Sequence, residues 1–275
     1  MANLQRAKQL TNLKGNTNPS VLIVGGGING IGLYRDLALQ GVDVLLVEQK
    51  DFCSGASAAL SRMVHGGLRY LEQGEFRLVR ESLEERNILL RNAPHYVKPL
   101  PTTIPVFDYA SGIMNALLRF LGLSEKPGRR GALVIKLGLT LYDFFTRTRR
   151  ETPTHNFQGQ KETFLRWPEL HPDVKCSATY FDAWVTYPER LGLEMVMDVA
   201  QTDTAAMAVN YMSVASSDGK SVTLRDEVSG EEISVEPGIV VNATGAWIDL
   251  TNGALQGGDN SHANRMVGGT KGSHL

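Results

Sequence analysis

The sequence predicts an α/β fold in which a domain with a parallel sheet is interleaved with a second, β-rich domain. Two short apolar runs, Val21–Val24 and Val42–Val47, are typical of buried parallel strands. Between them, residues 29–40 carry apolar side chains at helical spacing, and Gly41 is suited to end that helix. Together these segments form a βαβ unit of the Rossmann type.

Length and composition agree with this class. A chain of 275 residues suits one large α/β unit or two intertwined domains. Its 42% apolar and 21% charged residues are ordinary for a globular protein. We assign residues 20–98 and 186–250 to the parallel-sheet domain, residues 99–185 and 251–275 to the β-rich domain, and residues 1–19 to a polar tail.

The later elements follow the same two periodicities. Helical spacing returns over Phe76–Leu90, where the charge run Arg80–Arg86 is expected to be a solvated face with i,i+4 pairs. Another helix is expected over Leu191–Ala200, and the prolines between residues 94 and 105 mark a boundary. Further strands are expected at Val209–Val214, Ser221–Arg225, Glu232–Val235 and Gly238–Asn242, with turns at Asp218-Gly219 and Ser229-Gly230.

Charge and cysteine content exclude several function classes. A net charge of −1 gives no nucleic-acid footprint. Cys53 and Cys176 are too few for a disulfide framework or a four-ligand zinc site, so we expect no metal centre. The first twenty residues do not resemble a secretory signal, and no apolar stretch reaches the ~18 residues of a membrane span. We therefore expect a cytoplasmic protein, soluble or associated with a surface.

The first motif that carries chemistry is Gly25-x-Gly27-x-x-Gly30, between the first strand and its helix. These glycines permit a tight turn and close approach to a pyrophosphate, which helix N-terminal amides then face. Glu48 ends the next strand at about the 20-residue spacing at which an acidic side chain binds ribose hydroxyls. The motif predicts a dinucleotide site but does not separate NAD from FAD; the alternative is a glycine-rich turn without a nucleotide.

The segment after Glu48 favours FAD. Residues 51–67 are rich in serine, glycine and alanine and lack a clear period, where a nicotinamide-binding domain would soon begin another crossover helix. Backbone groups and hydroxyls of such a stretch suit an extended ligand such as the pyrophosphate and ribityl chain of FAD. A surface loop is the alternative, although loops of this length in compact domains are usually functional.

Several strings in order along residues 21–275 resemble the FAD-dependent glycerol-3-phosphate dehydrogenase family. The most specific is His65-Gly66-Gly67-Leu68-Arg69-Tyr70-Leu71, followed by Glu75–Glu81. The remaining matches are Gly25–Gly30, Ala93-Pro94-His95, Tyr180–Ala183, Arg190, Asn242–Gly245 and Lys271–His274. The resemblance implies a DAO-like flavoprotein with an FAD-binding domain and a substrate domain.

The resemblance also implies roles for particular residues. Arg69 and Tyr70 would bind the substrate phosphate, and Lys271 is a further candidate for substrate binding. His65 would lie beside the flavin as the candidate catalytic residue. FAD contacts are expected from Gly25, Gly27, Asn29, Gly30, Glu48, Ser54, Ser57, Ser61, His65, Gly66, Gly67, Val214, Ala243, Thr244 and Gly245.

Two of these assignments have structural alternatives. Arg69 offers a planar, permanently charged fork that suits phosphate, but a surface salt bridge would also explain it. His65 follows the apolar Val64 and is either a hydrogen-bonded core histidine or a base that takes the carbinol proton.

The expected reaction is oxidation of sn-glycerol 3-phosphate to dihydroxyacetone phosphate, with hydride passing from C2 to flavin N5 and electrons then to quinone. Oxygen is the alternative acceptor, which would make the protein an oxidase. Another polyol phosphate, such as erythritol phosphate, is the alternative substrate, because Ala58–Leu60 and Ala246 depart from the family pattern. The alternative of another class is a non-catalytic fragment that binds FAD or membrane. The family has a further section after the Lys271–His274 match, so the substrate domain is expected to be incomplete.

Residues 131–150 bear on membrane contact. Their apolar side chains are flanked by arginines, a pattern typical of an amphipathic helix on an anionic surface. A core helix with a solvated basic end explains the same pattern. The resemblance favours peripheral contact with the inner face of the cytoplasmic membrane, where quinone is found.

Overall fold

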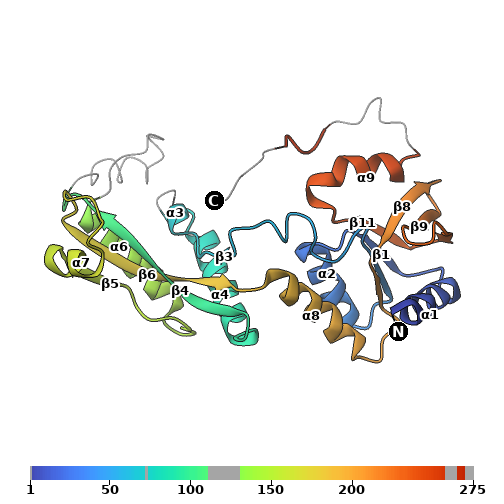
Figure 1. Cartoon of the computed structure of the whole chain (residues 1–275), viewed down its shortest axis with the longest axis horizontal. Helices are drawn as coiled ribbons and strands as arrows, with labels where there is room; N and C mark the ends of the chain where they lie inside the picture. Colours follow the sequence, from blue (N-terminus) through green and yellow to red (C-terminus); the bar gives the residue numbers. More distant parts are fainter. Residues whose placement is uncertain (1, 72–73, 111–130, 258–264, 270–275) are drawn as a thin grey trace. The chain divides into compact units, whose positions relative to one another are not determined.

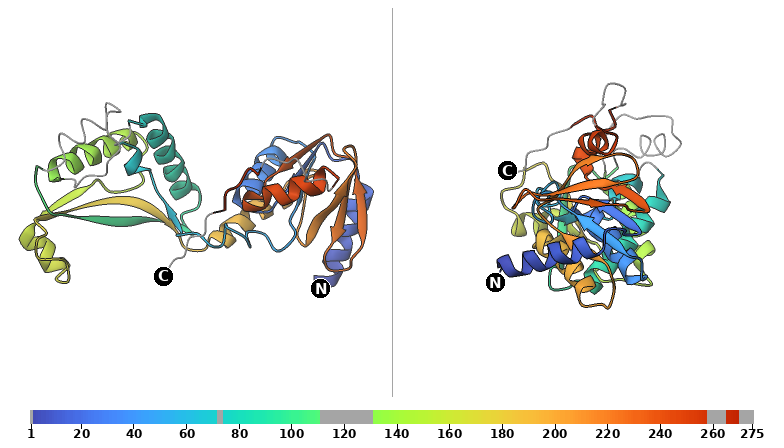
Figure 2. Two further views of the ribbon diagram at one scale, coloured as in Figure 1. Left: turned by 90° about the horizontal axis from the view of Figure 1, so that it is seen from above. Right: turned by 90° about the vertical axis from the view of Figure 1, so that its right-hand side faces the viewer.

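The computed structural model describes residues 2–71, 74–110, 131–257 and 265–269. The chain divides into two compact units, Met1–Ser61 with Tyr187–Leu275 (unit 1) and Arg62–Thr186 (unit 2). Figure 1 shows the helices and strands of both units, and Figure 2 shows the same ribbon from two further sides. The predicted α/β class is confirmed, and parallel and antiparallel sheets occur in one chain.

Unit 1 is built around a parallel sheet with the strand order β11-β1-β2-β7. Every residue of β1 and β2 is buried, as expected of strands covered on both faces. All three strand pairs are parallel. The strands are β1 (Val21–Val24), β2 (Val44–Val47), β7 (Met207–Val209) and β11 (Ile239–Asn242).

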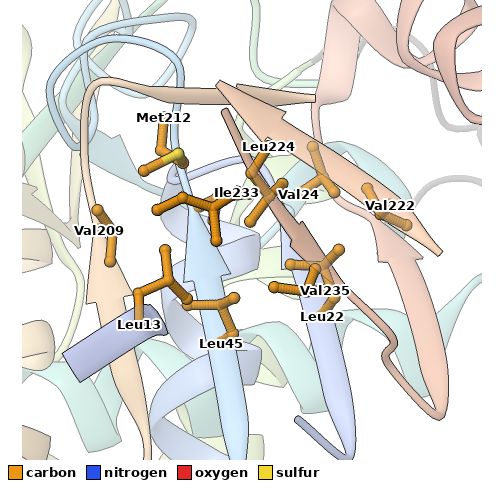
Figure 3. Close-up of a cluster of buried hydrophobic side chains, with 11 residues drawn as sticks. Leu13, Leu22, Val24, Leu45, Val209, Met212, Val222, Leu224, Ile233 and Val235 are labelled. Atoms are coloured by element: carbon orange, nitrogen blue, oxygen red, sulfur yellow. The ribbon is translucent and has the colours of Figure 1, made fainter. Parts of the chain in front are cut away.

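The two faces of this sheet are covered by different layers. Val21 and Ile23 face a cluster that includes residues of α2 (Ile28–Leu39) and α8 (Pro188–Ala200). Leu22 and Val24 face the opposite cluster, drawn in Figure 3. That cluster includes residues of an antiparallel sheet of three strands, β8 (Met212–Ser217), β9 (Val222–Asp226) and β10 (Glu232–Val235).

The expected polar tail is wrong, because residues Ala2–Gly15 form helix α1. Its Leu13 is 1% exposed and joins the cluster of Figure 3. Arg6 donates to the Asn210 carbonyl at 2.6 Å and to the Asp226 carboxylate at 2.5 Å. The helix is held by one buried leucine and these polar contacts, so its sequence carries little of the apolar periodicity that marks a helix.

The expected strand over Val209–Val214 is two strands, because the chain passes from one sheet to the other. β7 ends at Val209 and β8 begins at Met212. Between them, Tyr211 has a φ of +52°, a left-handed conformation that turns the backbone. The turns predicted at Gly219 and Gly230 are confirmed, with φ angles of +89° and +77°.

Unit 2 contains an antiparallel sheet in the order β3-β6-β4, with β5 also paired to β6. Its strands are β3 (Met63–Val64), β4 (Val97–Val106), β5 (Asn156–Gly159) and β6 (Cys176–Val185). Its helices are α3 (Leu68–Leu71), α4 (Phe76–Asn92), α6 (Ala132–Thr146) and α7 (Gln160–Arg166). Buried residues of α4 and α6 pack with Ala178 and Tyr180 of β6.

The boundary expected at the prolines between residues 94 and 105 is wrong, because these residues lie inside unit 2, with Pro94 just before β4 and the other three within it. This ten-residue strand pairs only with β6 in the described sheet and contains Pro99, Pro101 and Pro105. These positions alternate, so the missing N–H groups all belong to one side of the strand. An edge strand tolerates proline on the side that faces no neighbour.

The observed division differs from the expected domain boundaries in two places. Residues 62–98 belong to unit 2, because β3 pairs with β6 and α4 packs against α6 and β4. Helix α9 (Ile248–Leu255) belongs to unit 1, because it packs against β8 and β11. Among the described residues, no helix is both long and apolar enough to cross a membrane.

Candidate functional site

The turn between β1 and α2 requires glycine at two positions. Gly25 has a φ of +114°, and a Cβ there would lie 2.7 Å from the carbonyl of Ala243. A Cβ on Gly30 would lie 1.9 Å from the carbonyl oxygen of Gly25. The predicted GxGxxG motif is therefore a strand-to-helix turn whose glycines permit close backbone approach.

Glu48 lies directly after β2 with both carboxylate oxygens held by backbone donors. The Gly26 N–H donates to Oε2 at 2.7 Å, and the Lys50 N–H donates to Oε1 at 2.9 Å. The side chain is thereby fixed against the glycine turn, at the carboxyl end of the sheet where Rossmann-type folds bind their ligand. A carboxylate has about four acceptor positions, so further ones remain for a ribose hydroxyl.

The Ser/Gly-rich segment folds back over the start of α2. Ser57 Oγ accepts a hydrogen bond from the Ile28 N–H at 3.0 Å, and the Cys53 N–H donates to the Gly26 carbonyl at 2.8 Å. Ser54 and Ser61 are exposed, as is Asn29 in the first turn of the helix. That first turn has no acidic residue, and its N-cap is Gly27, so the helix end suits an anion.

The Asn242–Gly245 turn lies beside the glycine turn because β11 pairs in parallel with β1. The Ala243 N–H donates to the Val24 carbonyl at 2.8 Å. Asn242 orients the turn: its Oδ1 accepts from Thr244 N at 3.2 Å and Oγ1 at 2.6 Å, and its Nδ2 donates to the Ile248 carbonyl at 3.0 Å. The predicted cofactor residues Ala243, Thr244 and Gly245 therefore share one edge with Gly25.

Asn242 itself was not predicted as a functional residue. The available signal was an asparagine just before the turn, a position from which its side chain can hydrogen-bond the backbone two residues on. Val214, by contrast, is half-buried against the core cluster of Figure 3, and its predicted contact with a cofactor stays a prediction.

In unit 2, the His65–Gly67 segment begins where β3 ends. His65 is exposed, whereas Gly66 and Gly67 are buried. A Cβ on Gly66 would lie 2.2 Å from both Leu83 Cδ2 and Tyr142 Oη. Gly67 has a φ of +73°, so both glycines are required by the local geometry.

A buried polar network lies beneath this segment, and the sequence did not reveal it. Asp182 Oδ1 accepts hydrogen bonds from the Gly66 N–H at 3.0 Å and from Tyr142 Oη at 2.5 Å. Arg86 is completely buried and donates to Tyr142 Oη at 3.1 Å, so its assignment to a solvated face is wrong. The i,i+4 pairs expected on that helix do form, at Arg77–Glu81 and Arg80–Glu84.

The predicted substrate residues are described only in part. Tyr70 is half-buried, its N–H donates to the Gly67 carbonyl at 2.8 Å, and it packs against the apolar cluster of α4. Arg69 belongs to α3, but its side chain lies outside what the structure describes, as does Lys271. Their phosphate-binding roles stay predictions.

The chain is similar to a protein family, to curated proteins and to a solved structure. Residues 20–275 match the family described as FAD dependent oxidoreductase. The chain is 40% identical over 273 residues to a glycerol-3-phosphate dehydrogenase of Synechocystis sp., covering 94% of this chain and 45% of that protein. It is 32% identical over 256 residues to D-erythritol 1-phosphate dehydrogenase of Brucella abortus, covering 93% and 46%.

The glycerol-3-phosphate dehydrogenase from Bacillus halodurans, solved in complex with FAD, shares the fold. Its TM-score is 0.59 at 24% identity, over 88% of this chain and 38% of that one. The chain thus spans less than half the length of the curated relatives it matches.

Proposed function

Because the chain belongs to the FAD-dependent oxidoreductase family, we propose that it binds FAD and oxidises glycerol 3-phosphate to dihydroxyacetone phosphate. The observation that carries the choice of substrate is the 40% identity, over 94% of the chain, to a glycerol-3-phosphate dehydrogenase. Erythritol phosphate is the second candidate substrate, supported by the 32% identity to D-erythritol 1-phosphate dehydrogenase.

The residues of unit 1 fit the cofactor. A Cβ at Gly25 or Gly30 would collide with neighbouring backbone, so these glycines permit the tight turn of a pyrophosphate-binding motif. Glu48 is held after the end of β2, the position of a ribose-binding acid in such folds. Ser57 and the glycine N-cap of α2 lie where phosphates are bound in such folds. When bound, FAD supplies N5 as the acceptor for hydride from C2 of the substrate.

In unit 2, we assign the proton transfer to His65, whose exposed side chain follows β3 and is adjacent to the anchored Gly66. Histidine is the side chain that most often serves as a general base in enzymes. Arg69 and Tyr70, with Lys271, would hold the substrate phosphate. The support for these roles is the similarity of the His65–Leu71 string to the family.

An anaerobic titration of the FAD-loaded protein tests the proposal. Glycerol 3-phosphate should bleach the flavin absorption bands, and erythritol phosphate in a parallel titration tests the second candidate. A yellow protein that neither substrate bleaches would instead be a non-catalytic FAD-binding chain. Arg69→Ala should raise the substrate concentration needed for bleaching at unchanged FAD content, whereas Arg77→Ala, an exposed arginine paired with Glu81, should not.

We propose further that electrons pass to quinone and that α6 lies against a membrane surface. Ile135, Leu139 and Tyr142 face the core, whereas Leu133, Leu137 and Phe144 are 58%, 65% and 54% exposed. This outer stripe, with Arg147 stacked on Phe144 at 4.9 Å, suits an anionic interface.

Sedimentation with anionic vesicles should decrease in a Leu133→Ser, Leu137→Ser variant but not in a control with Leu165→Ser, an exposed leucine on α7. Reoxidation of the reduced flavin by a soluble quinone analogue, compared with air, separates a quinone-linked dehydrogenase from an oxidase.

A further inference from the structure

The point at which the chain leaves β3 is fixed by one side chain. β3 pairs with β6 through Met63–Trp184 and Val64–Ala183. Asp182 precedes Ala183 on β6, and its carboxylate, instead of a backbone carbonyl, accepts the hydrogen bond from the Gly66 N–H at 3.0 Å. The direction of His65 is therefore set between a strand pair on one side and a side-chain hydrogen bond on the other.

Asp182 is 2% exposed, so its charge requires partners within unit 2. Tyr142 donates to the same oxygen that Gly66 uses. Burial, followed by the charge of Asp182, raises the pKa of Tyr142 far above its ordinary value, so this phenol keeps its proton and remains a donor. The Arg86 guanidinium lies 3.7 Å from the carboxylate and supplies the opposite charge.

Arg86 also contacts residues other than Asp182. It donates to the Phe181 carbonyl at 2.6 Å and to Asn87 Oδ1 at 2.9 Å, and it lies 5.4 Å from the Tyr142 ring centroid. Asn87 in turn donates to the Arg149 carbonyl at 2.7 Å. The chain of contacts runs from Arg149, just after α6, through α4 to β6 and ends on the Gly66 N–H.

A buried ion pair is a poor way to gain stability, because apolar residues of similar volume are often as stabilising. What an apolar cluster lacks is a directed acceptor for a backbone N–H. We propose that Asp182, Tyr142 and Arg86 are positioning residues of the oxidation: they hold Gly66 in place and so fix the side chain of His65. This inference rests on the proposed function, in which His65 takes the substrate proton.

Hydrogen–deuterium exchange of the FAD-loaded full chain tests the anchoring without any turnover. Tyr142→Phe keeps the ring and removes one donor to Asp182, and Asp182→Asn keeps an acceptor but removes the charge. Both variants should exchange faster in peptides covering residues 62–71, with unchanged exchange in unit 1. The control is Arg80→Ala, which removes an exposed ion pair on the same helix. Unchanged exchange at 62–71 in both variants would overturn the anchoring.

Stopped-flow reduction of the bound flavin tests the positioning. Because a misplacement of about 1 Å can cost about 100-fold, we expect the limiting rate to fall about 10–100-fold in Tyr142→Phe. The substrate concentration at half-saturation and the FAD content should change little, since neither the phosphate residues nor unit 1 is altered. A limiting rate equal to that of Arg80→Ala would refute the positioning role.

These outcomes separate the two proposals. If the wild-type flavin is not reduced by either polyol phosphate, the proposed function fails, and with it the role of the network in that reaction. The exchange data would then still decide whether the network anchors residues 62–71. If the wild type is reduced and only the variants are slow, both proposals stand.

Discussion

The close approach of Gly30 to the β1–α2 turn leads to a direct test of the dinucleotide cradle. In Gly30→Ala, the new Cβ would lie 1.9 Å from the carbonyl oxygen of Gly25, about 1.1 Å inside the shortest contact that real Cβ atoms make. That oxygen belongs to the backbone, so the turn itself must move. Overpacking of this kind typically costs about 1–3 kcal/mol, and more where the backbone cannot shift.

Gly32→Ala is the matched control. It lies on the same helix, and its Cβ would meet only Met195 Cε at 3.9 Å, an ordinary contact. Each substitution gains helix propensity, about 0.5–1 kcal/mol within a helix, so the difference between the variants reports the packing cost at Gly30.

Urea unfolding should therefore place Gly32→Ala at or above the wild type and Gly30→Ala below it. FAD content per chain should fall only in Gly30→Ala. Equal stability and equal FAD content in the two variants would refute the close-approach argument.

Three other measurements test the site and its surroundings. Glu48→Gln should weaken FAD binding by about 1.5–3 kcal/mol, the range for a hydrogen bond to a charged group, and a fluorescence titration that finds unchanged affinity would remove Glu48 from the ribose site. Burial, then the charges of Glu189, Glu48 and Asp51, raise the pKa of Cys53 to about 11, so the buried thiol stays protonated and should be alkylated far more slowly at pH 9 in the folded protein than in urea; equal rates would contradict this. Burial alone would raise the pKa of Asp226, but hydrogen bonds from Arg6, Ser229 and the Val228 N–H lower it. The stability that Asp226 contributes is therefore present above the ordinary carboxyl pKa and is lost as the pH falls through the lowered pKa of the folded state. Urea unfolding between pH 2 and 7 should show a smaller acid loss in Asp226→Asn than in the wild type.

The parts of the fold that the sequence predicted are those whose signal is local. Continuous apolar runs mark β1 and β2 because parallel strands are buried on both faces. The proline-bearing strand β4 escaped prediction because proline is acceptable only once the strand is known to lie at an edge. Helix α1 escaped because Leu13 and the Arg6–Asp226 pair are understandable only with the partner sheet present.

The site divides in the same way. The glycine turn and Glu48 have a fixed spacing along the chain, and the structure brings them together. The network that holds Gly66 has no such fixed spacing along the chain, because Asp182, Tyr142 and Arg86 come from three different elements. Arg86 has the helical spacing of Val79, Leu83 and Leu90, which is a local signal for the buried face of α4. The charges that precede it favoured a solvated position instead, and its partners Asp182 and Tyr142 come from other elements.

The three glycine-containing stretches have one device in common. In each, a side-chain oxygen accepts a backbone N–H: Glu48 from Gly26, Asp182 from Gly66 and Asn242 from Thr244. Glycine lets the backbone approach a ligand closely but adds conformational freedom, and a fixed acceptor removes that freedom without filling the space. Variants of these acceptors should therefore lose order in the glycine stretch before they lose the fold. For Glu48, a structural loss of this kind must be separated from loss of the ribose contact, and exchange at residues 25–30 in the absence of FAD makes that separation.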